Sequence, residues 1–96
     1  MDNQPALEVT PSRPIRFTNP DDELPFFYAN NTQLQLSNWD LQVDFGMIKG
    51  ASETEMLVRK QVRIVMSLQH AKAFLGLVTK TLAAYEEKMG EIRYEP

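Results

Sequence analysis

The chain of 96 residues contains no cysteine and a single histidine. Without thiolates it can form neither a disulfide framework nor a cysteine-based zinc site. His70 follows Ser67 by three residues, but such a pair lacks the third orienting group and the oxyanion hole of a hydrolase. Gly46 and Gly50 precede a strand rather than a helix, so they do not form a phosphate-binding loop. We therefore expect no catalytic residues, no metal, no cofactor and no enzymatic activity.

The chain also lacks long apolar runs and a basic excess. No apolar run approaches the ~18 residues that span a bilayer, and the opening MDNQPALEVTPSRP lacks the basic and apolar regions of a signal peptide. These absences predict a cytoplasmic protein that does not bind membranes. The net charge of −3 arises within residues 1–25, because residues 26–96 hold eight basic and eight acidic side chains. Nucleic-acid binders normally carry a basic surface, so we expect no nucleic-acid partner.

Proline is scarce outside the N-terminal quarter. Five of the six prolines fall within residues 1–25, where each removes a backbone donor and disfavours helix in the preceding residue. Large apolar residues are few in this stretch. We expect residues 1–25 to form a flexible arm, in which Ile15-Arg16-Phe17 can add a short strand to a sheet edge.

From Phe26 onward, apolar residues alternate with polar ones, which is typical of half-buried β-strands. Short polar connections between them predict antiparallel neighbours. Gly46 indicates a bulge or a strand end, and Lys60 falls in phase with the apolar residues of its strand. The predicted order is a strand over about 26–36, a turn at Ser37-Asn38, a strand from Trp39 to about Met47, a loop over 49–55 and a strand over about 56–66.

The period then changes to 3.6, which predicts a helix ending near Met89. Ser67 is suited to cap its start and Gly90 to stop it. Apolar residues form one helix stripe: Ala71, Phe74, Leu75, Val78, Leu82, Tyr85 and Met89.

The predicted fold is an α+β domain over residues 26–92, followed by a tail at 93–96. It is a three-stranded antiparallel meander with one long C-terminal helix packed on one face. The side chains expected to be buried together between helix and sheet are Trp39, Phe45, Ile64, Phe74 and Val78.

Two surfaces are candidate functional sites. The polar face of the sheet, either solvated or packed against something, is predicted to carry Gln33, Gln35, Gln42, Asp44, Arg59 and Arg63. Cross-strand pairs on it are worth about 0.2–1 kcal/mol each. A second helix stripe, predicted as an oligomer interface or else a half-exposed flank, holds Ala73, Gly76, Leu77 and Ala84. A glycine within a helix costs about 1 kcal/mol of stability relative to alanine. Close approach of another helix would explain why Gly76 is a glycine.

Several ordered motifs point to a known family. They are Tyr28-Ala29-Asn30, Ser37 with Asp40 and Asp44-Phe45-Gly46, Met66-Ser67, His70-Ala71-Lys72, Tyr85-Glu86-Glu87 and Gly90-Glu91-Ile92. Over about residues 27–92 the chain resembles domain-of-unknown-function family 3467, although Ser67-Leu68 stands where that family usually has Ser-Pro. The resemblance implies a short, single-domain bacterial protein and no known activity.

The leading functional hypothesis is a non-enzymatic protein-interaction module that binds itself as a homo-oligomer. A domain of about 70 structured residues is marginal on its own, which favours a partner subunit. The alternative hypothesis is a peptide-binding chaperone of the SecB type, with unfolded polypeptide held in an apolar groove between helix and sheet. That alternative depends on architecture alone.

Overall fold

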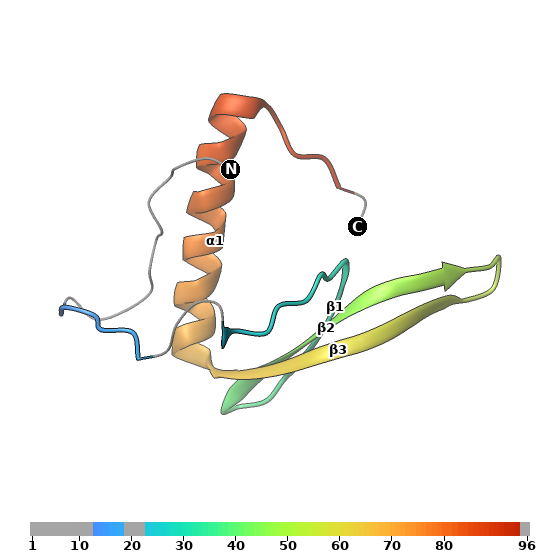
Figure 1. The fold of residues 1–96 in the computed structure, drawn as a ribbon, viewed down its shortest axis with the longest axis horizontal. Helices are drawn as coiled ribbons and strands as arrows, with labels where there is room; N and C mark the ends of the chain where they lie inside the picture. Colours follow the sequence, from blue (N-terminus) through green and yellow to red (C-terminus); the bar gives the residue numbers. More distant parts are fainter. Residues whose placement is uncertain (1–12, 19–22, 95–96) are drawn as a thin grey trace. The chain divides into compact units, whose positions relative to one another are not determined.

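The computed structural model describes residues 13–18 and 23–94. Within them the chain forms three strands, β1 (Asn31–Leu36), β2 (Asp40–Ala51) and β3 (Met56–Ser67), and the helix α1 (Leu68–Met89) (Figure 1). The strands make one antiparallel sheet in the order β1-β2-β3. The predicted α+β fold, a three-stranded meander followed by a long helix, is confirmed.

The sheet belongs to one compact unit, residues 14–68, and α1 to another. The packing of the helix on a face of the sheet therefore stays a prediction.

Two serines hold the turns of the meander in the same way. Between β1 and β2, the Ser37 Oγ accepts hydrogen bonds from the backbone N–H of Trp39 at 3.1 Å and of Asp40 at 3.0 Å. Between β2 and β3, the Ser52 Oγ accepts from the N–H of Thr54 and Glu55. A serine hydroxyl that satisfies turn donors in this way mimics a backbone turn. The turn predicted at Ser37 is confirmed, whereas β2 extends into the predicted loop as far as Ala51.

The predicted bulge at Gly46 is confirmed. Phe45 lies opposite Val62, but Gly46 lies opposite Lys60, so Gln61 is an extra residue in β3. A Cβ atom on Gly46 would lie 2.8 Å from the Arg59 carbonyl oxygen and 2.8 Å from the Val58 Cγ1. Glycine is therefore needed here because the neighbouring strand approaches too closely for any side chain.

Asn30 closes the start of β1. Its backbone N–H donates to the Gly46 carbonyl at 3.0 Å, and its Oδ1 accepts from the Ile48 N–H at 2.8 Å. The amide side chain thus satisfies a β2 donor beyond the end of β1. The strand begins at Asn31 rather than at Phe26, so the predicted start of this strand was wrong by about five residues.

The helix ends as predicted. Gly90 has a φ of 96°, in the left-handed region that glycine adopts without steric cost. Its N–H donates to the Glu86 carbonyl at 2.9 Å, and the Glu86 carboxylate accepts from the Ile92 N–H at 2.8 Å. At the other end of the helix, the His70 ring stacks on the Phe74 ring with centroids 6.5 Å apart.

The core predicted between helix and sheet stays a prediction, because α1 and the sheet belong to separate units. Among the described residues Val43 is the buried apolar side chain, while Trp39 is 85% exposed and Ile64 is also exposed. Val43 lies in the central strand and has Leu34 and Ile64 beside it, whereas Trp39 lies in the turn between β1 and β2 and pairs with no strand residue. Within its own unit, α1 buries none of its residues, Phe74 and Val78 included.

The N-terminal arm falls partly outside the described residues, which exclude 1–12 and 19–22. Residues 13–18 are described, are exposed and contain no strand. The strand suggested for Ile15-Arg16-Phe17 is therefore not formed.

Candidate functional site

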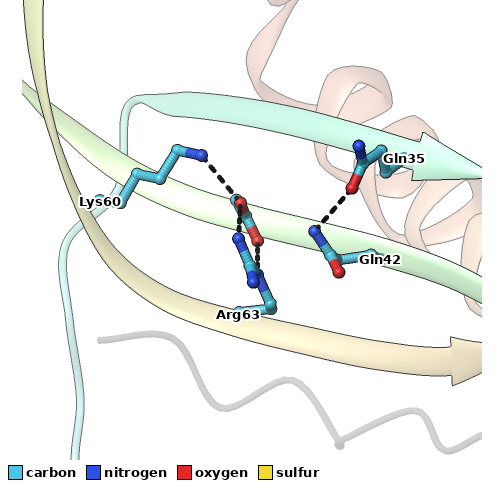
Figure 2. A network of polar contacts seen from close by, with 5 residues as sticks. Gln35, Gln42, Lys60 and Arg63 are labelled. Atoms are coloured by element: carbon cyan, nitrogen blue, oxygen red, sulfur yellow. Dashed lines mark hydrogen bonds and ion pairs between the residues drawn. The ribbon is translucent and has the colours of Figure 1, made fainter.

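Asp44 is the centre of an ion-pair cluster on the polar face of the sheet. Figure 2 shows Lys60 and Arg63 converging on one carboxylate. The Arg63 Nε donates to its Oδ1 at 2.7 Å and the Arg63 Nη2 to its Oδ2 at 3.0 Å. Lys60 Nζ donates to the same Oδ2 at 3.1 Å. A guanidinium that meets both carboxylate oxygens forms the strongest type of side-chain pair, since its planar fork matches the acceptor geometry.

The bulge decides which basic residues reach Asp44. Arg63 lies directly opposite Asp44 across β2 and β3. The extra residue Gln61 shifts the alternation, so Lys60 rather than Arg59 falls on the polar face. Arg59 lies opposite Met47 instead. The expected placement of Arg59 on this face, and of Lys60 on the apolar face, is corrected, because one inserted residue exchanges the two faces of a strand.

The carboxylate of Asp44 is enclosed while its partners stay accessible. Its side chain is 7% exposed, against 55% for Lys60 and 57% for Arg63. The hydrogen bonds from Arg63, and after them the bond from Lys60, outweigh the effect of burial and lower the pKa of Asp44 from 3.8 to about 2. The same pair raises the pKa of Arg63. Asp44 is therefore ionised and fully engaged at neutral pH, so it is not available as a general acid.

This cluster predicts a pH dependence of stability. Because the pKa of Asp44 is lower in the folded chain, its contribution is present above about pH 4 and is lost as the pH falls toward 2. Asp44→Asn should lower the urea midpoint at pH 7, and its deficit relative to the wild type should shrink between pH 4 and pH 2. Glu53→Gln, at the exposed β2–β3 turn, is the control. Parallel curves for Asp44→Asn and wild type from pH 7 to pH 2 would contradict the assignment.

A shallow hollow of about 280 Å³ lies over this face. Its lining comprises Gln33, Leu34, Gln35, Gln42, Asp44, Lys60 and Arg63. The Gln42 Nε2 donates to the Gln35 Oε1 at 3.1 Å (Figure 2). The structure thus brings together Gln33, Gln35, Gln42, Asp44 and Arg63 of the predicted polar face. Lys60 is the member that sequence reasoning missed, because Gly46 signalled a bulge but not that the extra residue, Gln61, lies in β3.

The second candidate surface lies on α1. Ala73, Gly76 and Ala84 are exposed and Leu77 is half-buried. A Cβ atom on Gly76 would meet no atom within 4 Å. Nothing in the described part of the chain therefore requires glycine at this position.

Comparison with family models decides the classification. The family described as "Protein of unknown function (DUF3467)" matches residues 1–94. The chain belongs to family DUF3467. Neither the curated proteins nor the solved structures gave a match.

Several residues that carry the DUF3467 resemblance have structural roles. The Asn30 side chain accepts a hydrogen bond from the backbone N–H of Ile48 in β2. Ser37 holds the first turn, and Gly46 allows the bulge. Asp44 anchors the ion pairs and Gly90 ends the helix. In this DUF3467 chain, these motif residues hold the hairpins and the helix end.

The described residues contain neither a metal-ligand cluster nor a membrane-spanning helix. No group of three or more His, Cys, Asp or Glu side chains is placed to hold a metal ion. No helix in the same part of the chain combines the length and apolar character that crossing a bilayer requires.

Proposed function

We propose that this DUF3467 protein is a non-enzymatic protein-interaction module that works in the cytoplasm as a homo-oligomer. The observation that carries the proposal is α1, a helix of 22 residues that buries none of them within its own unit. Within that unit its apolar stripe is uncovered: Leu75 is 62% exposed, Leu82 is 47% exposed, and Phe74, Tyr85 and Met89 are exposed as well.

An apolar stripe of this length favours a covering partner on energetic grounds. Helices in proteins owe most of their stability to packing of an apolar face rather than to intrinsic propensity. Full burial of a leucine or phenylalanine side chain contributes about 1.5–3 kcal/mol. Covering several such side chains is thus comparable with the whole stability of a small domain, about 5–15 kcal/mol.

A second copy of the chain is the partner that we infer. A two-fold axis beside α1 brings the same stripe of each copy together, as an isologous interface requires. The small-residue stripe of Ala73, Gly76, Leu77 and Ala84 lies on the opposite side of the helix. It offers a separate contact, since the space around Gly76 is open. Close approach of a second backbone there accounts for a glycine that otherwise costs the helix about 1 kcal/mol.

The cluster around Asp44 supports the non-enzymatic part of the proposal. Both oxygens of the buried carboxylate accept hydrogen bonds from basic side chains. A group engaged in this way stabilises the pairing of β2 with β3 and is not free to move protons.

The SecB-type chaperone remains the second candidate, because exposed apolar side chains also suit the binding of unfolded polypeptide. It predicts that an unfolded client protein competes for the same helix stripe. Saturable binding of reduced, unfolded α-lactalbumin, lost when the stripe is made polar, would favour this candidate over a simple oligomeric module.

The test of the proposed function is the molar mass in solution. Sedimentation equilibrium of the full chain at micromolar concentration should give a dimer or a larger multiple of 11.0 kDa. A mass of one chain across the whole concentration range would show that the proposal is wrong.

A further inference from the structure

We infer that β1 pairs through its outer edge with β1 of a second copy, in antiparallel orientation, to join two sheets into one of six strands. This inference rests on the proposed homo-oligomer and names a second surface through which its copies join. It concerns the sheet alone and is independent of which helix stripe is covered.

The outer edge of β1 is unoccupied by the described residues. β1 lies at one side of the sheet, with β2 as its neighbour (Figure 1). Within residues 13–18 and 23–94 no other segment pairs with it. Every residue from Thr32 to Leu36 is exposed. An edge of this kind presents a row of unpaired backbone donors and acceptors, which is a template for another strand.

β1 also lacks the features that protect an edge strand from pairing. No charged residue stands between Glu23 and Asp40, and β1 itself contains no proline. Its register with β2 is uninterrupted, so it carries no bulge. Natural proteins usually block a free edge with charges, proline or a bulge. Because β1 has none of these three features, we expect its exposed edge to pair with another strand.

The opposite edge of the same sheet provides the comparison. β3 carries Arg59, Lys60 and Arg63, and Gln61 forms a bulge in it. Like charges placed opposite one another across a ladder are destabilising. β3 is therefore protected against pairing with its own copy while β1 is not. Pairing through β1 alone closes after two copies, because it uses the unprotected edge of each.

The alternation of β1 allows it to pair with itself. Leu34 and Leu36 lie on the face of Val43, whereas Gln33 and Gln35 lie on the face of Asp44. A two-fold axis through Leu34 brings the leucine-bearing faces of the two β1 strands side by side. It also sets Gln33 opposite Gln35 of the second copy. Neighbouring glutamines already bond on this face, as Gln42 does with Gln35 at 3.1 Å.

The backbone favours the same register. The Ser37 N–H donates to the Asp40 carbonyl at 3.0 Å, and inward and outward groups alternate along an antiparallel strand. The N–H and C=O groups of Thr32, Leu34 and Leu36 therefore point away from β2. An axis through Leu34 pairs Leu34 with its copy and Thr32 with Leu36, so all three residues are satisfied.

A single cysteine tests this register, because the chain has no cysteine of its own. In the inferred ladder the two Leu34 Cα atoms lie ~5.5 Å apart, within the ~4.4–6.8 Å that a disulfide spans. Leu34→Cys should oxidise to a covalent dimer roughly a thousandfold faster than Glu53→Cys, since pairing raises the effective thiol concentration from micromolar to millimolar. The readout is non-reducing electrophoresis of the full chain.

A second pair of variants distinguishes a failure to pair from a failure to fold. Thr32→Cys mixed with Leu36→Cys should form the mixed disulfide in preference to either self-linked product. Circular dichroism reports whether each variant keeps the sheet and helix. If folded Leu34→Cys links no faster than Glu53→Cys while the wild type is an oligomer, β1 pairing is wrong and the proposed function stands.

The remaining outcomes are also decisive. A monomeric wild type with no Leu34→Cys cross-link would overturn both proposals. Oxidation in cells that links Leu34→Cys to a different protein, and not to its copy, would show that β1 receives a foreign strand and would overturn the self-pairing.

Discussion

Leu82→Glu is expected to remove the contact through α1 and so to lower the molar mass of the oligomer at micromolar concentration. Leu82 lies in the middle of the apolar stripe of α1 and is 47% exposed, so the proposed second copy covers it. A carboxylate at that position would be buried without a partner, and an unpaired buried charge costs several kcal/mol. Sedimentation equilibrium measures the mass, and circular dichroism is expected to show reduced helix content in the dissociated chain.

Ala83→Glu is the matched control for this variant. Ala83 is exposed and follows Leu82 directly, but consecutive residues of a helix point about 100° apart and do not share a face. The same charge should therefore leave the mass unchanged. Dissociation by both variants would indicate a general effect of charge on the helix, and dissociation by neither would place the interface away from this stripe.

Gly46→Ala is expected to destabilise the sheet by about 1–3 kcal/mol, the usual cost of forcing extra atoms into a packed site. The new Cβ atom would lie 2.8 Å from the Arg59 carbonyl oxygen, and a backbone atom cannot move aside without disturbing β3. Urea denaturation at fixed protein concentration measures the loss, since the stability of an oligomer depends on concentration.

Gly50→Ala is the control in the same strand. A Cβ atom there meets no atom within 4 Å, so a change within about 0.5 kcal/mol is expected. Equal effects of the two substitutions would mean that the bulge does not need glycine. Because the bulge also places Lys60 beside Asp44, Gly46→Ala should weaken the pH dependence that depends on Asp44.

The face around Asp44 differs from the edge of β1 and the stripe of α1 in what it leaves unsatisfied. The face around Asp44 is closed by its own ion pairs and amide bonds, so it is satisfied within one chain. The edge of β1 and the stripe of α1 are open. We therefore expect partners to bind through the open surfaces. The role of the Asp44 cluster is to hold β2 and β3 in register.

The sequence by itself determined the local features of this protein. Alternation at Leu41, Val43 and Phe45 marked a strand with one apolar face, and the change of period marked the helix. Ser37 and Gly90 were correctly read as the turn and the helix stop, because their chemistry acts on backbone groups within a few residues. Gly46 correctly marked a bulge. The polar face was recognised through Gln33, Gln35, Gln42, Asp44 and Arg63.

Only the tertiary structure decided the features that depend on neighbouring strands. The choice of Lys60 over Arg59 follows from where the bulge inserts a residue in β3, and a single strand carries no record of its partner's register. The burial of Val43 and the exposure of Trp39 depend on which strand is central. The open edge of β1 likewise exists only once the strand order is known, because an edge is defined by the neighbour that is absent.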